Sequence, residues 1–184
     1  MTTTGPRHDG AEHPAAALRG QYRDVLRGPD GRVRWDRGWQ SNAIVGDCRK
    51  LLASFIRGTP AANGLIGLQV GAGLSQWDST GPPPATSGQT ALVDPNPFRL
   101  TTLQIDFLNA GAVSSTPTNR LQVLATFGPG FPPWPNGSHV TGNLREFGLV
   151  AQLGGSAVLI NYVTHPVIAK DRDSTLERTV WLTF

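Results

Sequence analysis

The chain has 184 residues, including 22 Gly and 15 Pro, with 39% hydrophobic and 16% charged residues and a formal net charge of +3. This composition excludes a helical bundle, because each Gly inside a helix costs about 1 kcal/mol and each Pro about 3 kcal/mol, and it favours many short strands joined by turns. The single cysteine, Cys48, excludes a disulfide scaffold, and no apolar run approaches the roughly 20 residues that span a bilayer, so we expect no membrane insertion.

The first 20 residues are predicted to form an extended arm ahead of a single domain at residues 21–184. The arm is small and polar, and such a segment alone cannot bury enough apolar surface to offset the entropy lost on ordering. We therefore expect a neighbouring subunit to hold it. The N-terminus has no apolar signal-peptide region, so we expect the protein to be assembled in the cytoplasm.

Arginines are concentrated near the N-terminus. Residues 1–58 hold ten of the sixteen Lys and Arg residues, and Arg19, Arg23 and Arg27 are candidate interface residues that would contact an acidic partner. The simpler interpretation is an Arg-rich surface, because acidic residues are interleaved and no aromatic stacking platform accompanies the basic residues. We do not expect nucleic acid as a partner.

A β-hairpin and a helix are predicted next. Residues 21–39 indicate a hairpin, since Pro29-Asp30-Gly31 is a tight-turn signal. A helix is predicted at about residues 43–57, capped by Ser41 or Asn42. Its apolar stripe is expected to pack on a sheet. The residues at helical spacing are Ile44, Cys48, Leu51, Leu52, Phe55 and Ile56.

About six further strands are predicted. They are Leu65–Val70, a strand within 99–111, a strand at 120–128, and three closing strands between residues 144 and 184, with a hairpin turn at Gly154-Gly155. The expected fold class is mainly β: an antiparallel β-sandwich with one covering α-helix and an extended N-terminal arm.

Two long loops, at residues 71–90 and 128–138, carry aromatic residues. Trp77, Phe131 and Trp134 are predicted to be exposed interface residues, because rigid aromatic rings lose little entropy on binding. The prolines of the second loop are expected to hold Phe131 and Trp134 ready for docking.

Residues with catalytic potential are scattered along the chain. The four histidines lack metal-ligand spacing on a helix, and Cys48 lies on the apolar stripe of the predicted helix. A glycosidase needs two converging carboxylates, for which Asp106 and Glu146 are candidates. We expect no catalytic, cofactor-binding or metal-binding residue, and no cofactor.

Four segments carry motifs that occur together, in this order, in one group of proteins. The motifs are GWQSNAIV with a following R-x-L-L-A at residues 38–53, LQVGAG with WD at 68–78, LREFGL at 144–149, and LINYV, HPVIAK and LERT at 159–179. They resemble those of tail-associated β-sandwich proteins from bacteriophages and phage-tail-like contractile injection particles. Val150 stands where that pattern usually has an aromatic residue. The resemblance spans about residues 38–184 and implies a component of a virion or tail-like particle without catalysis.

Three functions are compatible with these features. The motifs favour a non-catalytic structural subunit of a phage tail or tail-like contractile particle, in the baseplate, neck or fibre-attachment region. Such a subunit would dock to other particle subunits and form a homo-oligomer within a symmetric assembly. The alternative is a carbohydrate- or receptor-binding module at a fibre tip, with the loop aromatics as stacking platforms. The third choice is a sandwich-fold glycoside hydrolase.

Overall fold

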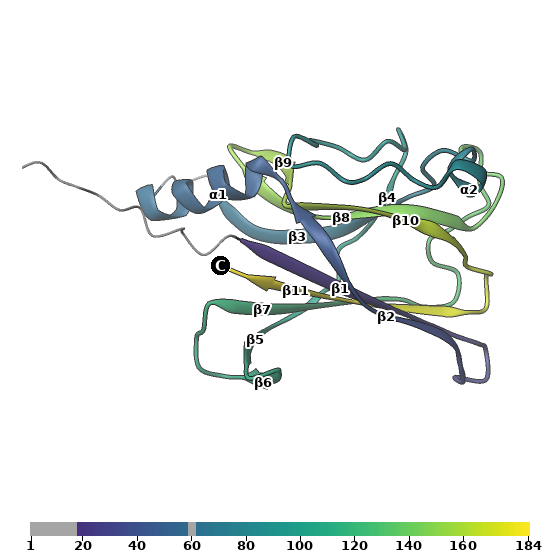
Figure 1. Ribbon diagram of the computed structural model, residues 1–184, viewed down its shortest axis with the longest axis horizontal. Coiled ribbons are helices and arrows are strands. Elements are labelled where there is room, and N and C mark those ends of the chain that lie inside the picture. Colours follow the sequence, from purple (N-terminus) through teal and green to yellow (C-terminus); the bar gives the residue numbers. More distant parts are fainter. Residues whose placement is uncertain (1–17, 59–61) are drawn as a thin grey trace, which may run out of the picture.

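The computed structural model describes residues 18–58 and 62–184. These residues form eleven strands and two short helices (Figure 1). The strands are β1 (Arg19–Arg27), β2 (Val33–Ile44), β3 (Asn63–Gly71), β4 (Phe98–Leu100), β5 (Gln104–Asn109), β6 (Ala112–Ser114), β7 (Arg120–Phe127), β8 (Asn143–Leu153), β9 (Ser156–Leu159), β10 (Asn161–Ala169) and β11 (Thr175–Thr183), and the helices are α1 (Gly46–Arg57) and α2 (Trp77–Thr80).

All the strands belong to one antiparallel sheet in the order β4-β3-β8-β10-β2-β1-β11-β7-β5-β6, with β9 paired to β8. β10 and β2 are joined by only two residue pairs, Asn161 with Ile44 and Tyr162 with Ala43. Figure 1 shows β3, β8 and β10 above β1, β11 and β7, while β2 runs from one level to the other. We call the strands β3, β4, β8, β9 and β10 the upper group and the remaining strands the lower group. The expected mainly β, antiparallel architecture is confirmed.

The apolar core lies between the two groups. Strand β11 alternates as period-two strands do: Leu176, Arg178, Val180 and Leu182 are buried, and the residues that alternate with them are partly exposed. Tyr22 on β1 packs edge-to-face on Phe147 of β8, with 5.1 Å between the ring centroids. Contacts of this kind join strands that do not share hydrogen bonds, so the two groups are held together by side chains as well as by β2.

The N-terminal hairpin is confirmed as β1 and β2. Its turn uses Gly31 at φ 75°, whose N–H donates to the carbonyl of Gly28 at 3.0 Å, while Asp30 accepts from the N–H of Arg32. β1 begins at Arg19, two residues before the expected start of the domain. Residues 1–17 of the expected arm lie outside the described residues.

The other predicted strands are confirmed, with two of them divided and one strand added. The strand within 99–111 is divided into β4 and β5, and the second of the three closing strands is divided at Ile160 into β9 and β10. The short strand β6 was not predicted. At the break between β9 and β10 the side chain of Asn161 accepts a hydrogen bond from the N–H of Leu149 at 2.7 Å, in place of a regular ladder bond. Gly154 and Gly155, both at positive φ, form the predicted turn between β8 and β9.

Helix α1 starts later than predicted and covers less of the sheet. It begins at Gly46 with Val45 as N-cap and no side-chain cap bond, so the expected cap at Ser41 or Asn42 is wrong; both residues belong to β2. Within the helix, the buried residues are Cys48 and Leu51. Farther along the same stripe, Phe55 is 45% exposed and Ile56 is 90% exposed. The helix therefore packs through Cys48, Leu51 and the partly buried Leu52, while its last turn is exposed. No helix in the described part of the chain has both the length and the apolar character needed to cross a membrane.

Truncation of the buried helix residue is expected to destabilise the protein. Leu51→Ala should lower the free energy of unfolding by about 2–5 kcal/mol, because it removes a buried side chain and leaves a cavity. The matched change Ile56→Ala, at an exposed position of the same helix, should alter it by less than about 0.5 kcal/mol. Urea unfolding of both variants measures the difference, and equal losses would show that the two halves of α1 pack alike.

Candidate docking surface

The three aromatic residues predicted on loops lie at one end of the molecule, but only Phe131 is well exposed. It is 49% exposed, whereas Trp77 and Trp134 are 6% and 7% exposed. The expectation that all three side chains project into solvent is therefore wrong for the two tryptophans. The three residues lie where β3 and β7 end and β8 begins, the end that carries α2 in Figure 1.

Trp77 packs against the end of β3. Gly73 has a φ of 56°, and a Cβ there would lie 2.5 Å from the Trp77 ring, so this contact requires glycine. On β8, Arg145 makes two hydrogen bonds of 2.7 Å to the carboxylate of Asp78 and donates to the carbonyl of Ala72 at 2.8 Å. The hydrogen bonds from Arg145 hold the pKa of Asp78 below its usual value. Together these contacts fix α2 to β3 and β8.

Glu146, the next residue on β8, is fully buried and holds the segment between α2 and β4. Its carboxylate accepts hydrogen bonds from the N–H groups of Val93 and Asp94, at 2.9 and 2.7 Å, and from the hydroxyl of Tyr162 at 2.6 Å. Burial, and then the hydrogen bond to Glu146, raises the pKa of Tyr162, so the hydroxyl remains a donor. Three donors compensate the cost of burying the carboxylate.

Asp94 connects this segment to the loop that follows β7. Its Oδ2 atom accepts from the N–H of Ala72 at 2.7 Å and from Nε2 of His139 at 2.8 Å. The imidazole of His139 stacks on Trp134 with 3.8 Å between ring centroids. Asn136 accepts from the backbone N–H of His139 at 2.9 Å and closes the turn. This stacking on His139 buries the ring of Trp134.

Four exposed apolar side chains lie on the segments that this buried polar network holds, and we call them the loop-end surface. Leu74, Val93, Phe131 and Val140 are 42%, 39%, 49% and 90% exposed. In the sequence, Val93 directly precedes Asp94 and Val140 directly follows His139. Leu74 comes shortly after the end of β3, and Phe131 comes shortly before Trp134. Of these four residues, only Phe131 could be predicted from the sequence. Single exposed apolar residues on loops are common, so the other three carried no signal of their own.

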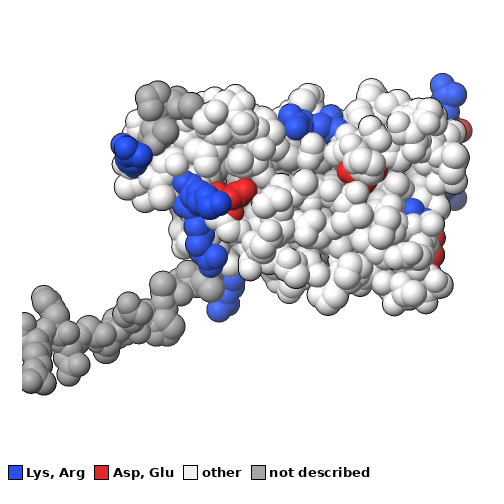
Figure 2. Space-filling view, turned by 90° about the horizontal axis from the view of Figure 1, so that it is seen from above, with Lys and Arg blue, Asp and Glu red and all other residues white. Residues whose placement is uncertain are grey.

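The candidate arginines Arg19, Arg23 and Arg27 all lie on the outer face of β1, as strand alternation requires. Arg23 pairs with Asp36 of β2, and Arg27 pairs with Glu177 of β11 at 3.0 Å. The hydrogen bond from Arg23 lowers the pKa of Asp36 to about 2. Figure 2 shows the largest group of Lys and Arg atoms at the end of the molecule that carries α1. Intramolecular ion pairs therefore neutralise two of the three candidates.

The carboxylates considered for a hydrolase are not brought together. Asp106 lies on β5, opposite Gln122 of β7 in the lower group, whereas Glu146 is enclosed in the upper group. Cys48 is buried, and burial raises the pKa of its thiol. Within residues 18–58 and 62–184 there is no group of three or more His, Cys, Asp or Glu side chains that could hold a metal ion.

Comparisons with protein-family models, with curated proteins and with solved structures found no match to this chain. Its function is therefore inferred from its own motifs and geometry.

Proposed function

We propose that the chain is a non-catalytic structural subunit of a phage tail or phage-tail-like contractile particle, which docks to a neighbouring subunit through the loop-end surface. One observation carries the proposal. Leu74, Val93, Phe131 and Val140 are exposed on segments whose backbone is fixed by the buried contacts of Glu146, Asp94 and Arg145.

Fixed loops suit docking because little conformational entropy remains to be lost when they bind. Each of these loops is tied by a charged or polar side chain to a neighbouring strand or loop, as in the bonds from Ala72 and His139 to Asp94. Apolar side chains presented in this way can occupy pockets of a partner and supply most of the binding energy. The partner is a protein subunit of the same particle with a complementary apolar surface.

We also propose that the two groups of strands act as a β-sandwich that supports these loops. Tyr22 and Phe147 face each other across the groups, as do Phe98 and Phe127, whose ring centroids are 6.4 Å apart. In such a sandwich β2 would form a corner, because it pairs with β1 of the lower group and with β10 of the upper group, and strands that pass between two sheets form corners in this way. The motifs that resemble the phage-tail family lie largely in these strands.

The proposal is tested by removing apolar side chains from the loop-end surface. Phe131→Ser with Val140→Ser should weaken docking to the neighbouring subunit by about 2 kcal/mol or more, with little change in Tm, because both side chains are exposed in the free chain. The measurement is the amount of tagged chain that co-purifies with intact particles.

Val113→Ser is the matched control for Val140→Ser. Val113 is 59% exposed on β6, an edge strand of the lower group, so its replacement should leave incorporation unchanged. Normal incorporation of the double variant would contradict the assigned surface. Loss of incorporation in the control to the same extent would show that the effect is not specific to the loop ends.

A further inference from the structure

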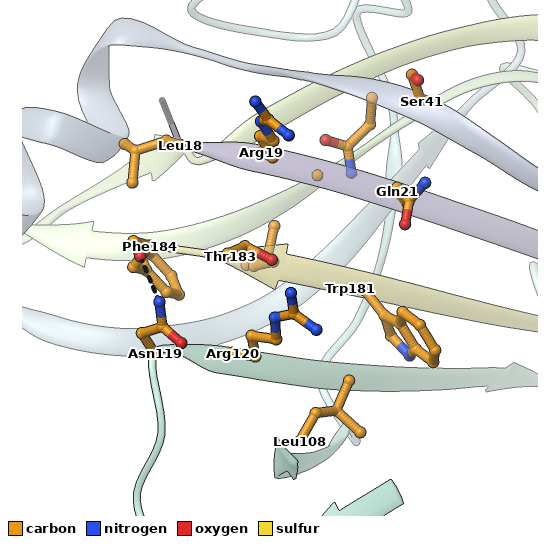
Figure 3. Close-up of a pocket in the computed structure, with 13 residues that line it drawn as sticks. Leu18, Arg19, Gln21, Ser41, Leu108, Asn119, Arg120, Trp181, Thr183 and Phe184 are labelled. Atoms are coloured by element: carbon orange, nitrogen blue, oxygen red, sulfur yellow. Dashed lines mark hydrogen bonds between the residues drawn. The ribbon is translucent and has the colours of Figure 1, made fainter. Parts of the chain in front are cut away.

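A pocket of about 710 Å³ lies at the opposite end of the molecule from the loop-end surface. It is formed by the start of β1 and β7 and the end of β11, together with residues from β2 and β5 (Figure 3). The strand register places Gln21 opposite both Trp181 and Ser41, and Thr183 opposite both Arg19 and Arg120, on the outer face of the lower group. Four strands thus contribute side chains to one surface.

Trp181 provides a fixed aromatic wall. Its indole N–H donates to the side chain of Gln122 at 3.0 Å, and its ring packs against Trp39, with 4.2 Å between centroids. Trp39 is 37% exposed and extends the aromatic surface beyond the pocket. An indole held on two sides presents a flat apolar face at little entropic cost.

The described side chains that line the pocket carry positive charge. The described residues that line it include Arg19 and Arg120, and none of them is Asp or Glu. Within the described part of the chain neither arginine forms an ion pair, whereas Arg23 and Arg27 on the same face are both paired. Arg19 and Arg120 flank Thr183 from the two neighbouring strands, about 10 Å apart at their Cα atoms. Two guanidinium side chains that line one pocket favour an anionic ligand.

We propose that this pocket binds an acidic saccharide. One sugar ring would lie on the face of Trp181, and its carboxylate or sulfate group would accept hydrogen bonds from Arg19 and Arg120. Gln21 and Ser41 supply neutral donors and acceptors for hydroxyl groups. Neutral polar side chains with one aromatic wall suit a hydroxylated ring better than a nucleic acid, which needs a continuous basic track for its phosphates.

The test is an array of acidic oligosaccharides, comprising uronic, sialic and sulfated types, each printed beside its neutral counterpart. The full chain is expected to bind at least one acidic oligosaccharide of the array with a Kd of about 1 mM or tighter. It should not bind the neutral counterpart of that oligosaccharide. Arg120→Gln and Trp181→Ala should each weaken that binding at least about tenfold in titration calorimetry. Arg32→Gln, at the exposed turn of the hairpin, is the matched control and should bind normally.

Three results would overturn the proposal. They are failure to bind any acidic member of the array, equal binding of acidic and neutral counterparts, and tighter binding of a single-stranded DNA oligomer than of any saccharide. If Trp181→Ala does not fold, Arg120→Gln still tests the proposal. This variant is expected to fold, because Arg120 is an exposed side chain at the start of β7. The loop-end variants Phe131→Ser and Val140→Ser should bind saccharide normally, so this proposal and the docking proposal fail independently.

Discussion

Asp24→Asn is expected to lower the free energy of unfolding by about 3–5 kcal/mol, because it leaves the guanidinium of Arg178 charged and uncompensated in the core. Both side chains are completely buried. Arg178 donates two hydrogen bonds of 2.7 Å to Asp24, and its guanidinium lies 3.8 Å from the ring centroid of Phe147. The measurement is urea unfolding at neutral pH.

The matched control is Glu177→Gln, one residue away from Arg178 on the opposite face of β11. Glu177 pairs with Arg27 at 3.0 Å, but both side chains are about one-third exposed. Its replacement should change the free energy of unfolding by less than about 1 kcal/mol. If the two variants lost similar amounts of unfolding free energy, the claim that Asp24 compensates the buried charge of Arg178 would be contradicted.

Acid is expected to destabilise the protein through His165. Burial first, and then the charge of Arg178, lowers the pKa of His165 to about 3. The geometry agrees with a neutral ring, since Nδ1 donates to the carbonyl of Pro166 at 2.9 Å and Nε2 faces Nη2 of Arg178 at 3.1 Å. The charged groups around it are Arg178 on β11, Asp24 on β1 and Arg37 on β2.

The sign follows from the lower pKa in the folded state. An unfolded chain takes up a proton on His165 below about pH 6.5, whereas the folded chain resists it until about pH 3, so stability falls as the pH drops between these values. At pH 4.5 the loss from this residue is about 2–3 kcal/mol.

His165→Gln isolates this contribution. An amide oxygen can accept from Arg178 in place of Nε2 but does not titrate. The variant should therefore lose less stability than the unchanged chain between pH 7 and pH 4.5, by about 2–3 kcal/mol, in urea unfolding at each pH. The same pH dependence in both proteins would show that His165 accepts a proton in the folded state as readily as in the unfolded one.

The strands and the hairpin could be predicted because their signals are local. Pro29-Asp30-Gly31 and Gly154-Gly155 mark turns through residues that tolerate the required backbone angles, and both turns form as expected. Helix α1 could also be predicted from the sequence, but its first residue could not. The periodic pattern begins at Ile44, and nothing local shows that this residue pairs with Asn161 in the sheet.

The loop-end surface depends on contacts between distant residues, so little of it could be predicted. Asp94 meets His139 across 45 positions, and Glu146 holds the N–H of Asp94 across 52 positions. Trp134 looked like an exposed residue because prolines flank it, yet it packs on His139 once the loop folds back. The pairing of Trp181 with Trp39 likewise requires β1 to lie between β2 and β11.

Electron microscopy of the particle purified through a tag on this chain tests the docking role most directly. If the account is correct, the chain occupies repeated positions in a symmetric particle, and Phe131 and Val140 are covered by an apolar surface of a neighbouring subunit. A map in which the loop-end surface faces solvent in every copy would contradict the account, as would recovery of the chain as a free monomer with no particle attached.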